Sequence, residues 1–246
     1  MKRYDLLDMI RGIALINMIL YHGIWDLVYL FHVNWQWYYS TVGYLWQQSI
    51  CWTFILLSGF CWSFGKKHFQ RGMIVFTAGL IVTATTIWFI PSERIVFGIL
   101  SMIGSSMLLM TFFNKFLQRI RPLTGVLNAF VLFMITRNIN AGFLGFEQWN
   151  LGKLPDILYA NVITAYLGFP GEEFYSTDYF SLFPWFYLYL TGYFLYRIFE
   201  RRNWNRFLKK SPLIRIQKIG KHSLEIYLLH QPILYIGLNV VFGIFQ

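Results

Sequence analysis

Seven apolar runs of about the length that crosses a lipid bilayer constrain the fold more than any other feature of this chain. A transmembrane helix needs about 20 mostly apolar residues to cross a hydrocarbon core about 30 Å thick. Only 13% of the 246 residues are charged, whereas about 25% of the residues in a soluble domain are charged. We therefore predict an all-α, polytopic transmembrane helix bundle forming one integral-membrane domain over residues 1–246, with spans near 7–31, 44–64, 73–91, 95–113, 122–137, 180–199 and 223–245.

The basic residues predict how these spans cross the membrane. Lysine and arginine gather in the cytoplasmic loops of membrane proteins, so the net charge of +10 reflects topology and does not indicate a nucleic-acid partner. We expect a cytoplasmic N-terminus and location in a bacterial cytoplasmic membrane. The cytoplasmic side then carries Lys2, Arg3, Lys66, Lys67, Arg71, Lys115, Arg119, Arg121 and the basic run 200–222.

The segment 138–179 is the one long loop on the opposite side. Within it, residues 154–169 contain an apolar stretch that is short for a span and typical of an interfacial or re-entrant element. If this stretch crossed as an eighth span, the basic run 200–222 would face outward. We therefore expect 138–179 to be an extracytoplasmic loop. In the fourth run, the small residues of SMIGSS (101–106) allow close packing between helices, which we expect, or room for an acyl chain.

The first run, LLDMIRGIALINMILYHGIWDL (6–27), carries four ionisable residues, although each costs free energy inside a bilayer. A helix turns about 100° per residue, so Arg11 and His22, about three turns apart, point the same way. Asp8 lies one turn before Arg11, and Asp26 one turn after His22. The four residues form one stripe, which we expect to face the bundle interior or a wet cavity.

The positions along this stripe suggest separate roles. His22 lies about 16 Å farther out than Arg11 along the helix. Asp26 is placed to hydrogen-bond His22, and a carboxylate that orients an imidazole is the usual support of a general base. The alternative is structural: an ion pair of Asp8 and Arg11 at the membrane boundary, with a histidine in a polar gap.

Three stretches of the sequence resemble membrane acyltransferases. The spacing Arg11–x10–His22 is similar to the signature of the acyltransferase-3 type. The whole string 6–27 resembles more closely the heparan-α-glucosaminide N-acetyltransferase-like family of the same broad group. DYFSLFPWFYLYLTGYFL (178–195) is similar to that family's entry to a late helix, and IGKHSLEIYLLHQPILY (219–235) to its closing helix.

This resemblance implies transfer of an acyl group, typically acetyl, from coenzyme A at the cytoplasmic side. The acceptor would be a hydroxyl or amine, usually on a sugar, on the other side, and no cofactor would stay bound. His22 would be the catalytic histidine and Arg11 a donor-side or structural residue. In the lysosomal members, however, the catalytic histidine belongs to a His-x-x-Trp stretch, which here matches His32 to Trp35. Both histidines remain candidates, and we prefer His22 for its depth and its stripe.

Other residues are candidates for the two substrate sides. Arginine suits phosphate because its guanidinium is a planar fork. The cytoplasmic-loop candidates for phosphate binding are therefore Arg71, Arg119, Arg121 and Arg215. Asp8 and Arg11 of the first run are also candidates for the donor side or for a structural role. Toward the acceptor or a tunnel, we single out Asp178, Trp185, His230 and Gln231. The structural alternative for Trp185 is an aromatic belt at the membrane interface. For His230, it is a proline kink in the helix, with the histidine hydrogen-bonded to a neighbouring helix.

Two other classes of function compete with the acyltransferase. Asp8, Arg11, His22 and His230 are also suited to the proton relay of a proton-coupled transporter, although the sequence shows none of the inverted repeats typical of such proteins. A non-catalytic assembly subunit is the third alternative. The sequence shows no zinc-type spacing and no GxSxG elbow, so we expect no metal. The acceptor, the acyl chain and self-association into a homo-oligomer stay open.

Overall fold

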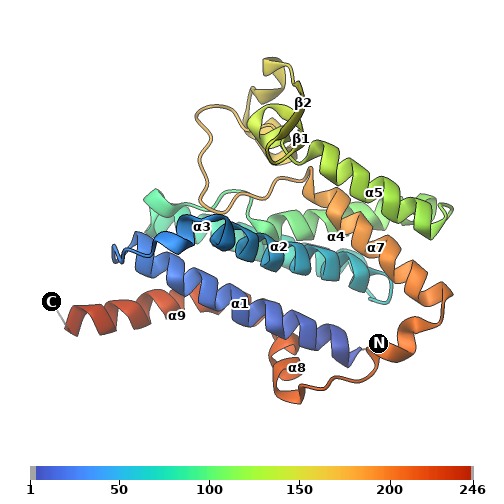
Figure 1. Cartoon of the computed structure of the whole chain (residues 1–246), viewed down its shortest axis with the longest axis horizontal. Coiled ribbons are helices and arrows are strands. Elements are labelled where there is room, and N and C mark those ends of the chain that lie inside the picture. Colours follow the sequence, from blue (N-terminus) through green and yellow to red (C-terminus); the bar gives the residue numbers. More distant parts are fainter. Residues whose placement is uncertain (1–3, 245–246) are drawn as a thin grey trace. The chain divides into compact units, whose positions relative to one another are not determined.

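The computed structural model describes residues 4–244 and places the chain in two compact units (Figure 1). Of the described residues, 55–203 form the central unit, and 4–54 together with 204–244 form the terminal unit. Helix α2 (Thr41–Trp62) begins in the terminal unit and ends in the central one.

The terminal unit is helical throughout its regular elements. Besides the first part of α2, its elements are α1 (Asp5–Tyr29), the 3-10 turns η1 (Gln36–Tyr39) and η5 (Trp204–Leu208), α8 (Ile214–Lys221) and α9 (Ser223–Ile244). Helix α1 packs against both α8 and α9.

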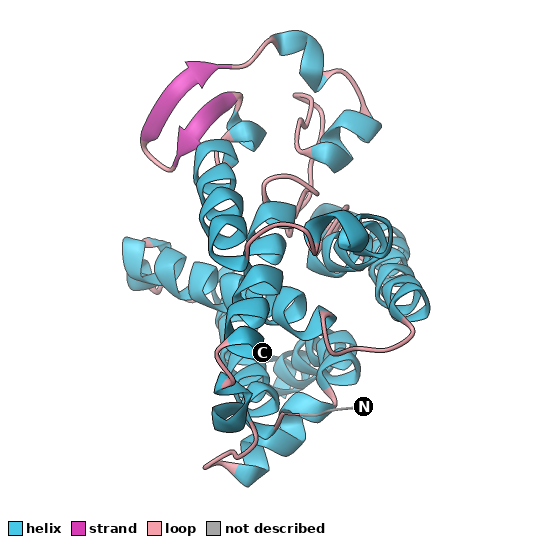
Figure 2. Ribbon diagram, turned by 90° about the vertical axis from the view of Figure 1, so that its right-hand side faces the viewer, coloured by secondary structure: helices cyan, strands magenta, loops and turns pink. Residues whose placement is uncertain are grey.

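The central unit adds a small hairpin to its helices. Its long helices are α3 (His68–Phe89), α4 (Ile99–Leu117), α5 (Pro122–Thr136) and α7 (Trp185–Arg201). Between α5 and α7 lie η3 (Ile139–Ala141), strands β1 (Phe143–Phe146) and β2 (Trp149–Lys153), η4 (Asp156–Tyr159) and α6 (Val162–Leu167), and η2 (Pro91–Glu93) follows α3. Figure 2 shows the two strands in magenta with short helical turns beside them.

All seven predicted runs form helices, but fewer qualify as spans by length and apolarity. Among the described residues, five helical segments do: α1, α3, α4, α9 and 122–141. Helix α7 has only 17 residues. In α2, the Trp, Gln, Ser and Thr side chains between the aliphatic ones lower the mean hydropathy of the helix. The chain is a helical membrane protein, while the count of seven spans and the cytoplasmic N-terminus remain predictions.

Small residues bring α3 and α4 together as the sequence predicts. A Cβ on Gly79 would meet the backbone of Ser101, and one on Gly104 would meet the backbone of Phe76. Lipid tails are as apolar as leucine, so helices in a membrane associate through such close backbone approach. Ser101, Gly104 and Ser105 are buried, which confirms that SMIGSS is a packing surface.

Arg197 of α7 closes the C-terminal end of α4. Its Nη1 donates to the carbonyl oxygens of Leu117 (2.8 Å) and Ile120 (3.2 Å), and its Nη2 donates to Gln118 (2.8 Å). The last carbonyls of a helix have no partner within the helix, and a cation at this end also opposes the negative end of the helix dipole. One arginine thus ties α7 to α4.

We expect Arg197→Met to lower the free energy of unfolding by about 1–3 kcal/mol, because three carbonyl oxygens at the end of α4 lose their charged hydrogen-bond donor. Thermal unfolding of the purified protein in detergent, followed by tryptophan fluorescence, measures this change. Arg201→Met is the matched control, since Arg201 lies exposed in the last turn of the same helix. Equal midpoints for the two variants would contradict a capping role for Arg197.

The predicted loop 138–179 is folded. Asn161 begins α6 with a capping box: its Oδ1 accepts from the backbone N–H groups of Ile163 (2.9 Å) and Thr164 (3.1 Å), and the Thr164 side chain accepts from the Asn161 N–H. With six residues, α6 is about 9 Å long, too short to cross a bilayer. The placement of the loop outside the cytoplasm remains a prediction.

The basic run 200–222, predicted as a loop, contains helix α8. Its Gly220 lies against the Asp8 carbonyl, and Ile216 presents its own carbonyl to Gly12 of α1. The buried Gln217 donates from Nε2 to Asp5 Oδ1. The loop prediction counted the charges of this run and overlooked its small and amide side chains, which form the face that packs on α1.

Candidate functional site

The polar stripe of α1 lies mostly inside the terminal unit. Asp8 and Asp26 are buried together with Leu15, which separates them along the stripe, while Arg11 and His22 are half-buried. Helices α8 and α9 pack against α1. The two carboxylates of the stripe, Asp8 and Asp26, therefore face protein and not lipid, as expected.

At the N-terminal end of the stripe, the ion pair of the structural alternative forms. Arg11 Nη1 lies 2.8 Å from Asp8 Oδ1 within one turn of helix. Asp5, one turn before Asp8, accepts the hydrogen bond from Gln217 of α8. The pair neutralises a buried carboxylate, as a helix inside a bilayer requires.

The C-terminal end of the stripe brings together residues from α1 and α9. The ring centroids of His22 and His230 are 5.0 Å apart, with their planes at 60°. Asp26 Oδ1 accepts a hydrogen bond from Gln231 Nε2 at 2.7 Å. Two histidines, a carboxylate and an amide thus form a polar cluster, called here the His22–His230 cluster (His22, Asp26, His230 and Gln231).

The expected hydrogen bond between Asp26 and His22 is absent among the described residues. Asp26 pairs with Gln231 instead, because the packing of α9 on α1 brings an amide donor to this short carboxylate. His22 makes ring contacts with Tyr21 (centroids 6.0 Å apart) and with His230. Its neighbours are therefore aromatic rings and not a carboxylate.

Three atoms of the His22–His230 cluster are buried and have no hydrogen-bond partner: Asp26 Oδ2, His230 Nε2 and Gln231 Oε1. His230 Nδ1 lies 2.5 Å from the carbonyl oxygen of Tyr227, so the neutral ring carries its proton on Nδ1 and a lone pair on Nε2. All three unpaired atoms then accept hydrogen bonds. Because buried unpaired polar atoms are rare and costly, the cluster is suited to a ligand that brings donors.

His32, the other histidine candidate, has different surroundings. It is exposed in the turn after α1, with a left-handed backbone (φ 54°). The turn itself is held by backbone bonds from Phe31 N–H to Asp26 and from Val33 N–H to Leu27. The structure therefore keeps His32 apart from the polar stripe, at the surface.

Asp178 lies in an extended segment of the central unit. Backbone hydrogen bonds from Thr177 to Arg94 and from Phe180 to Phe97 fix this segment on both sides of Asp178. The carboxyl is half-buried beside Gly98, and burial raises the pKa of Asp178 to about 6. A carboxyl that holds its proton this readily can either donate or accept near neutral pH.

This shift predicts a stability that falls as pH rises. Asp178 ionises near pH 4 in the unfolded chain and near pH 6 in the folded one. The free energy of unfolding therefore falls as the pH rises from about 4 to 6, and this loss is complete above about pH 6 and absent below pH 4. We expect Asp178→Asn to raise the thermal midpoint at pH 8 and to leave it unchanged at pH 4. Glu172→Gln, an exposed carboxylate of the same loop, is the control, and a gain by Asp178→Asn at both pH values would contradict the prediction.

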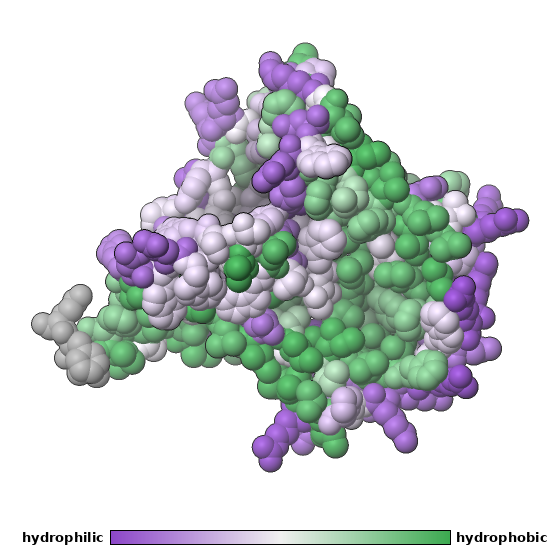
Figure 3. All heavy atoms as spheres, viewed as in Figure 1, coloured by the Kyte–Doolittle hydropathy of each residue, from purple (hydrophilic) through white to green (hydrophobic). Residues whose placement is uncertain are grey.

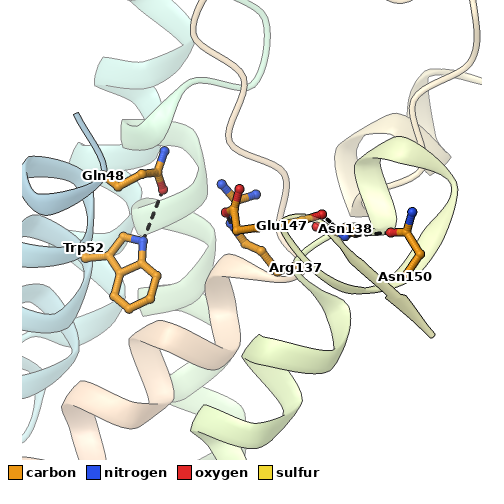
Figure 4. Close-up of polar contacts among 6 residues, drawn as sticks. All are labelled: Gln48, Trp52, Arg137, Asn138, Glu147 and Asn150. Atoms are coloured by element: carbon orange, nitrogen blue, oxygen red, sulfur yellow. Dashed lines mark hydrogen bonds and ion pairs between the residues drawn. The ribbon is translucent and has the colours of Figure 1, made fainter. Parts of the chain in front are cut away.

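Trp185 does not present a free ring face. It is 4% exposed, the guanidinium carbon of Arg137 lies 4.8 Å from its ring centroid, and Phe133 and Phe180 contact it from other directions. Arg137 also lies 3.5 Å from Glu147 at the turn of the hairpin (Figure 4). These contacts leave no room for a sugar ring on the indole, so we no longer assign it to the acceptor.

The four arginines proposed for the donor side are all exposed. Arg71 lies in the first turn of α3, and Arg119 and Arg121 lie in the turn between α4 and α5. Arg215 lies on α8 in the terminal unit. Three of the four thus belong to the helix ends of the central unit that we predict to be cytoplasmic.

Several residues that build the cluster belong to no recognisable sequence motif. Tyr21 contacts His22 and also packs on Tyr38 from η1, with centroids 5.1 Å apart. The carbonyl of Tyr227 sets the proton position of His230. Backbone atoms and aromatic rings carry no motif, but the position of Tyr227 one turn before His230 was a usable signal. Within the described residues, no group of three His, Cys, Asp or Glu side chains is arranged to hold a metal ion.

Comparison with known protein families finds one match that covers most of the chain. The family model described as heparan-alpha-glucosaminide N-acetyltransferase, catalytic, matches residues 3–232. Comparisons with curated proteins and with solved structures find no significant match. The matched range includes every residue of the His22–His230 cluster, and nothing in these findings favours a proton-coupled transporter.

Proposed function

The chain belongs to the heparan-alpha-glucosaminide N-acetyltransferase catalytic family and is a membrane acetyltransferase, and from that premise we propose that it transfers acetyl from acetyl-CoA to a hydroxyl or amine of a sugar. The donor would bind from the cytoplasm and the acceptor from the other side. The reaction takes place, in this proposal, at the His22–His230 cluster.

The observation that carries the proposal is the set of three unpaired acceptor atoms at Asp26, His230 and Gln231. A sugar or amino sugar brings several O–H and N–H donors, the groups that these acceptor atoms lack. The phosphates of coenzyme A bring mostly acceptors at neutral pH and do not match them. The cluster is therefore better suited to the acceptor than to the nucleotide part of the donor.

His22 is the proposed general base. Its ring is half-buried and makes no hydrogen bond among the described residues, so its ring nitrogens are available to a substrate. As the acceptor oxygen or nitrogen attacks the thioester carbonyl, the new C–O or C–N bond forms and the C–S bond breaks. The acceptor's proton passes to His22 and then to the departing thiolate, which leaves as free coenzyme A.

The remaining cluster residues position the acceptor. Gln231 holds Asp26 through a 2.7 Å hydrogen bond, and the Tyr227 carbonyl orients His230. Preorganised hydrogen-bond partners of this kind lower the cost of bringing reactants together. On the donor side, Arg215 of α8 in the same unit is proposed to bind the phosphates of the donor, where its exposure leaves it accessible. Arg71, Arg119 and Arg121 of the central unit, also exposed, stay candidates for the same role.

The experiment that tests the function uses the full chain in lipid nanodiscs with acetyl-CoA labelled in the acetyl group. Glucosamine and glucosamine-terminated oligosaccharides serve as acceptors, and mass spectrometry identifies the product. We expect a labelled N- or O-acetyl sugar together with an equal amount of free coenzyme A. Coenzyme A release without any acetylated sugar would rule out a sugar acceptor, and absence of both acetyl transfer and acetyl-CoA binding would overturn the proposed reaction.

A further inference from the structure

The segment between α5 and α7 exposes large apolar side chains although it lies outside the long helices. Trp149, Leu151, Ile157 and Ile163 are each between 70% and 82% exposed. They come from β2, η4 and α6, which are separate elements of the central unit. Single exposed apolar residues are ordinary, but several gathered on one segment mark a surface that something covers.

The length of α5 places this segment near the membrane boundary. The α-helix has 15 residues and so rises about 22 Å, and its apolar stretch extends to Ala141 through the η3 turn. Together these reach about the 30 Å thickness of the hydrocarbon core. Strand β1 begins two residues later, so the hairpin begins where the hydrocarbon ends.

The exposed surface continues from the lipid-facing side of α5. Leu127, Val131 and Ile135 are exposed on this helix, and the view in Figure 3 shows apolar atoms along it. Strand β1 contacts α5 directly. The hairpin is therefore joined directly to a helix that carries exposed apolar side chains of its own.

The chemistry of β2 fits phospholipid headgroups. All five of its residues are exposed, among them Trp149, Leu151 and Lys153, and a β-bulge at Leu151 interrupts the alternation of faces along the strand. Tryptophan is enriched at the membrane–water interface, and lysine keeps its charge in water while its carbon chain lies along apolar surface. The sheet has two strands, so β2 leaves one edge unpaired, which needs polar partners and excludes hydrocarbon.

We propose that residues 143–163 form an interfacial anchor in the outer leaflet of the bilayer. The four exposed side chains lie at the boundary of headgroups and acyl chains, and the free edge of β2 pairs with water and headgroups. The anchor fixes the end of α5 at the membrane boundary. Arg137 connects it to the rest of the central unit, since it pairs with Glu147 of the hairpin turn and lies over the ring of Trp185. The partner is a phospholipid surface, independent of the substrate proposed above.

Spin labels at positions 151 and 157 test this placement in the full chain. The background carries Cys51→Ala and Cys61→Ala, because these are the free cysteines, and the protein is reconstituted in phosphatidylcholine vesicles. The measurement is the ratio of collision rates with oxygen and with a water-soluble nickel chelate. Label positions 127 on α5 and 173 in the same loop provide the hydrocarbon and water references.

We expect the ratios at 151 and 157 to fall between those at the two references. Ratios equal to that at position 173 would overturn the anchor. Dipolar broadening that disappears when labelled protein is diluted with unlabelled protein would also overturn it, since a second copy would then cover the surface. As an independent measurement, Trp149→Phe in the native-cysteine chain should reduce the fluorescence quenching by lipids brominated near the headgroup; unchanged quenching would contradict insertion.

Discussion

Replacing His22 with alanine is expected to reduce acetyl transfer by about 10²–10⁴-fold, the range that general-base catalysis contributes. The residual activity would come from the bound and oriented acceptor. His22 contacts Tyr21 and His230 through ring edges and makes no hydrogen bond among the described residues. Its removal should therefore leave the fold of the terminal unit intact. Free thiol released from acetyl-CoA by purified protein, with acceptor present, measures the effect.

Two further variants separate the candidates. His32→Ala is expected to keep near wild-type activity because His32 is exposed in the turn after α1. His230→Ala removes one of the three acceptor atoms and should mainly raise KM for the acceptor. If His32→Ala is the inactive variant and His22→Ala is not, the His-x-x-Trp assignment holds and the base proposed here is wrong.

Gly220→Ala is expected to have the largest effect on stability, about 3 kcal/mol or more. A Cβ at this position would overlap the backbone carbonyl of Asp8, so α8 would have to move away from α1. Inserting a carbon into a tight contact typically costs about 1–3 kcal/mol, and here the obstacle is backbone, which cannot rotate aside. The same movement would separate Gln217 from Asp5. Thermal unfolding in detergent measures the loss.

Gly237→Ala is the matched control because it lies in α9 of the same unit, with nothing within 4 Å of the added carbon. Both substitutions replace a helical glycine, and alanine alone favours the helix by about 1 kcal/mol. Gly237→Ala should therefore leave the midpoint unchanged or raise it. A similar response to both substitutions would show that α8 does not pack on α1 through Gly220.

The helical positions and the polar stripe could be read from the sequence because each follows a simple period. Apolar runs predicted the helices, and the spacing of Asp8, Arg11 and Asp26 predicted their common face. The family resemblance, carried by three motifs, is confirmed over residues 3–232. These features depend on the spacing of residues that are close together in the sequence, so they can be read from one sequence.

The partners across helices could not be read in the same way. Sequence reasoning paired Asp26 with His22, one turn away, whereas the donor that reaches it is Gln231, 205 positions later. It likewise placed Trp185 toward a sugar, although Arg137 covers its ring. Both errors concern contacts fixed by tertiary packing, where a side chain bonds the nearest suitable group whatever its position in the sequence.

The pairing of α1 with α8 and α9 has a consequence for biosynthesis. A ribosome delivers α1 first and α9 last, so the buried carboxylate of Asp26 enters the membrane long before its partner Gln231 exists, whereas Asp8 already has Arg11 on its own helix. Until then, the charge of Asp26 must stay near water or beside an insertion factor. A chain that stops before residue 204 would lack the amide that pairs with Asp26, so the tolerance of α1 in the membrane depends on α9.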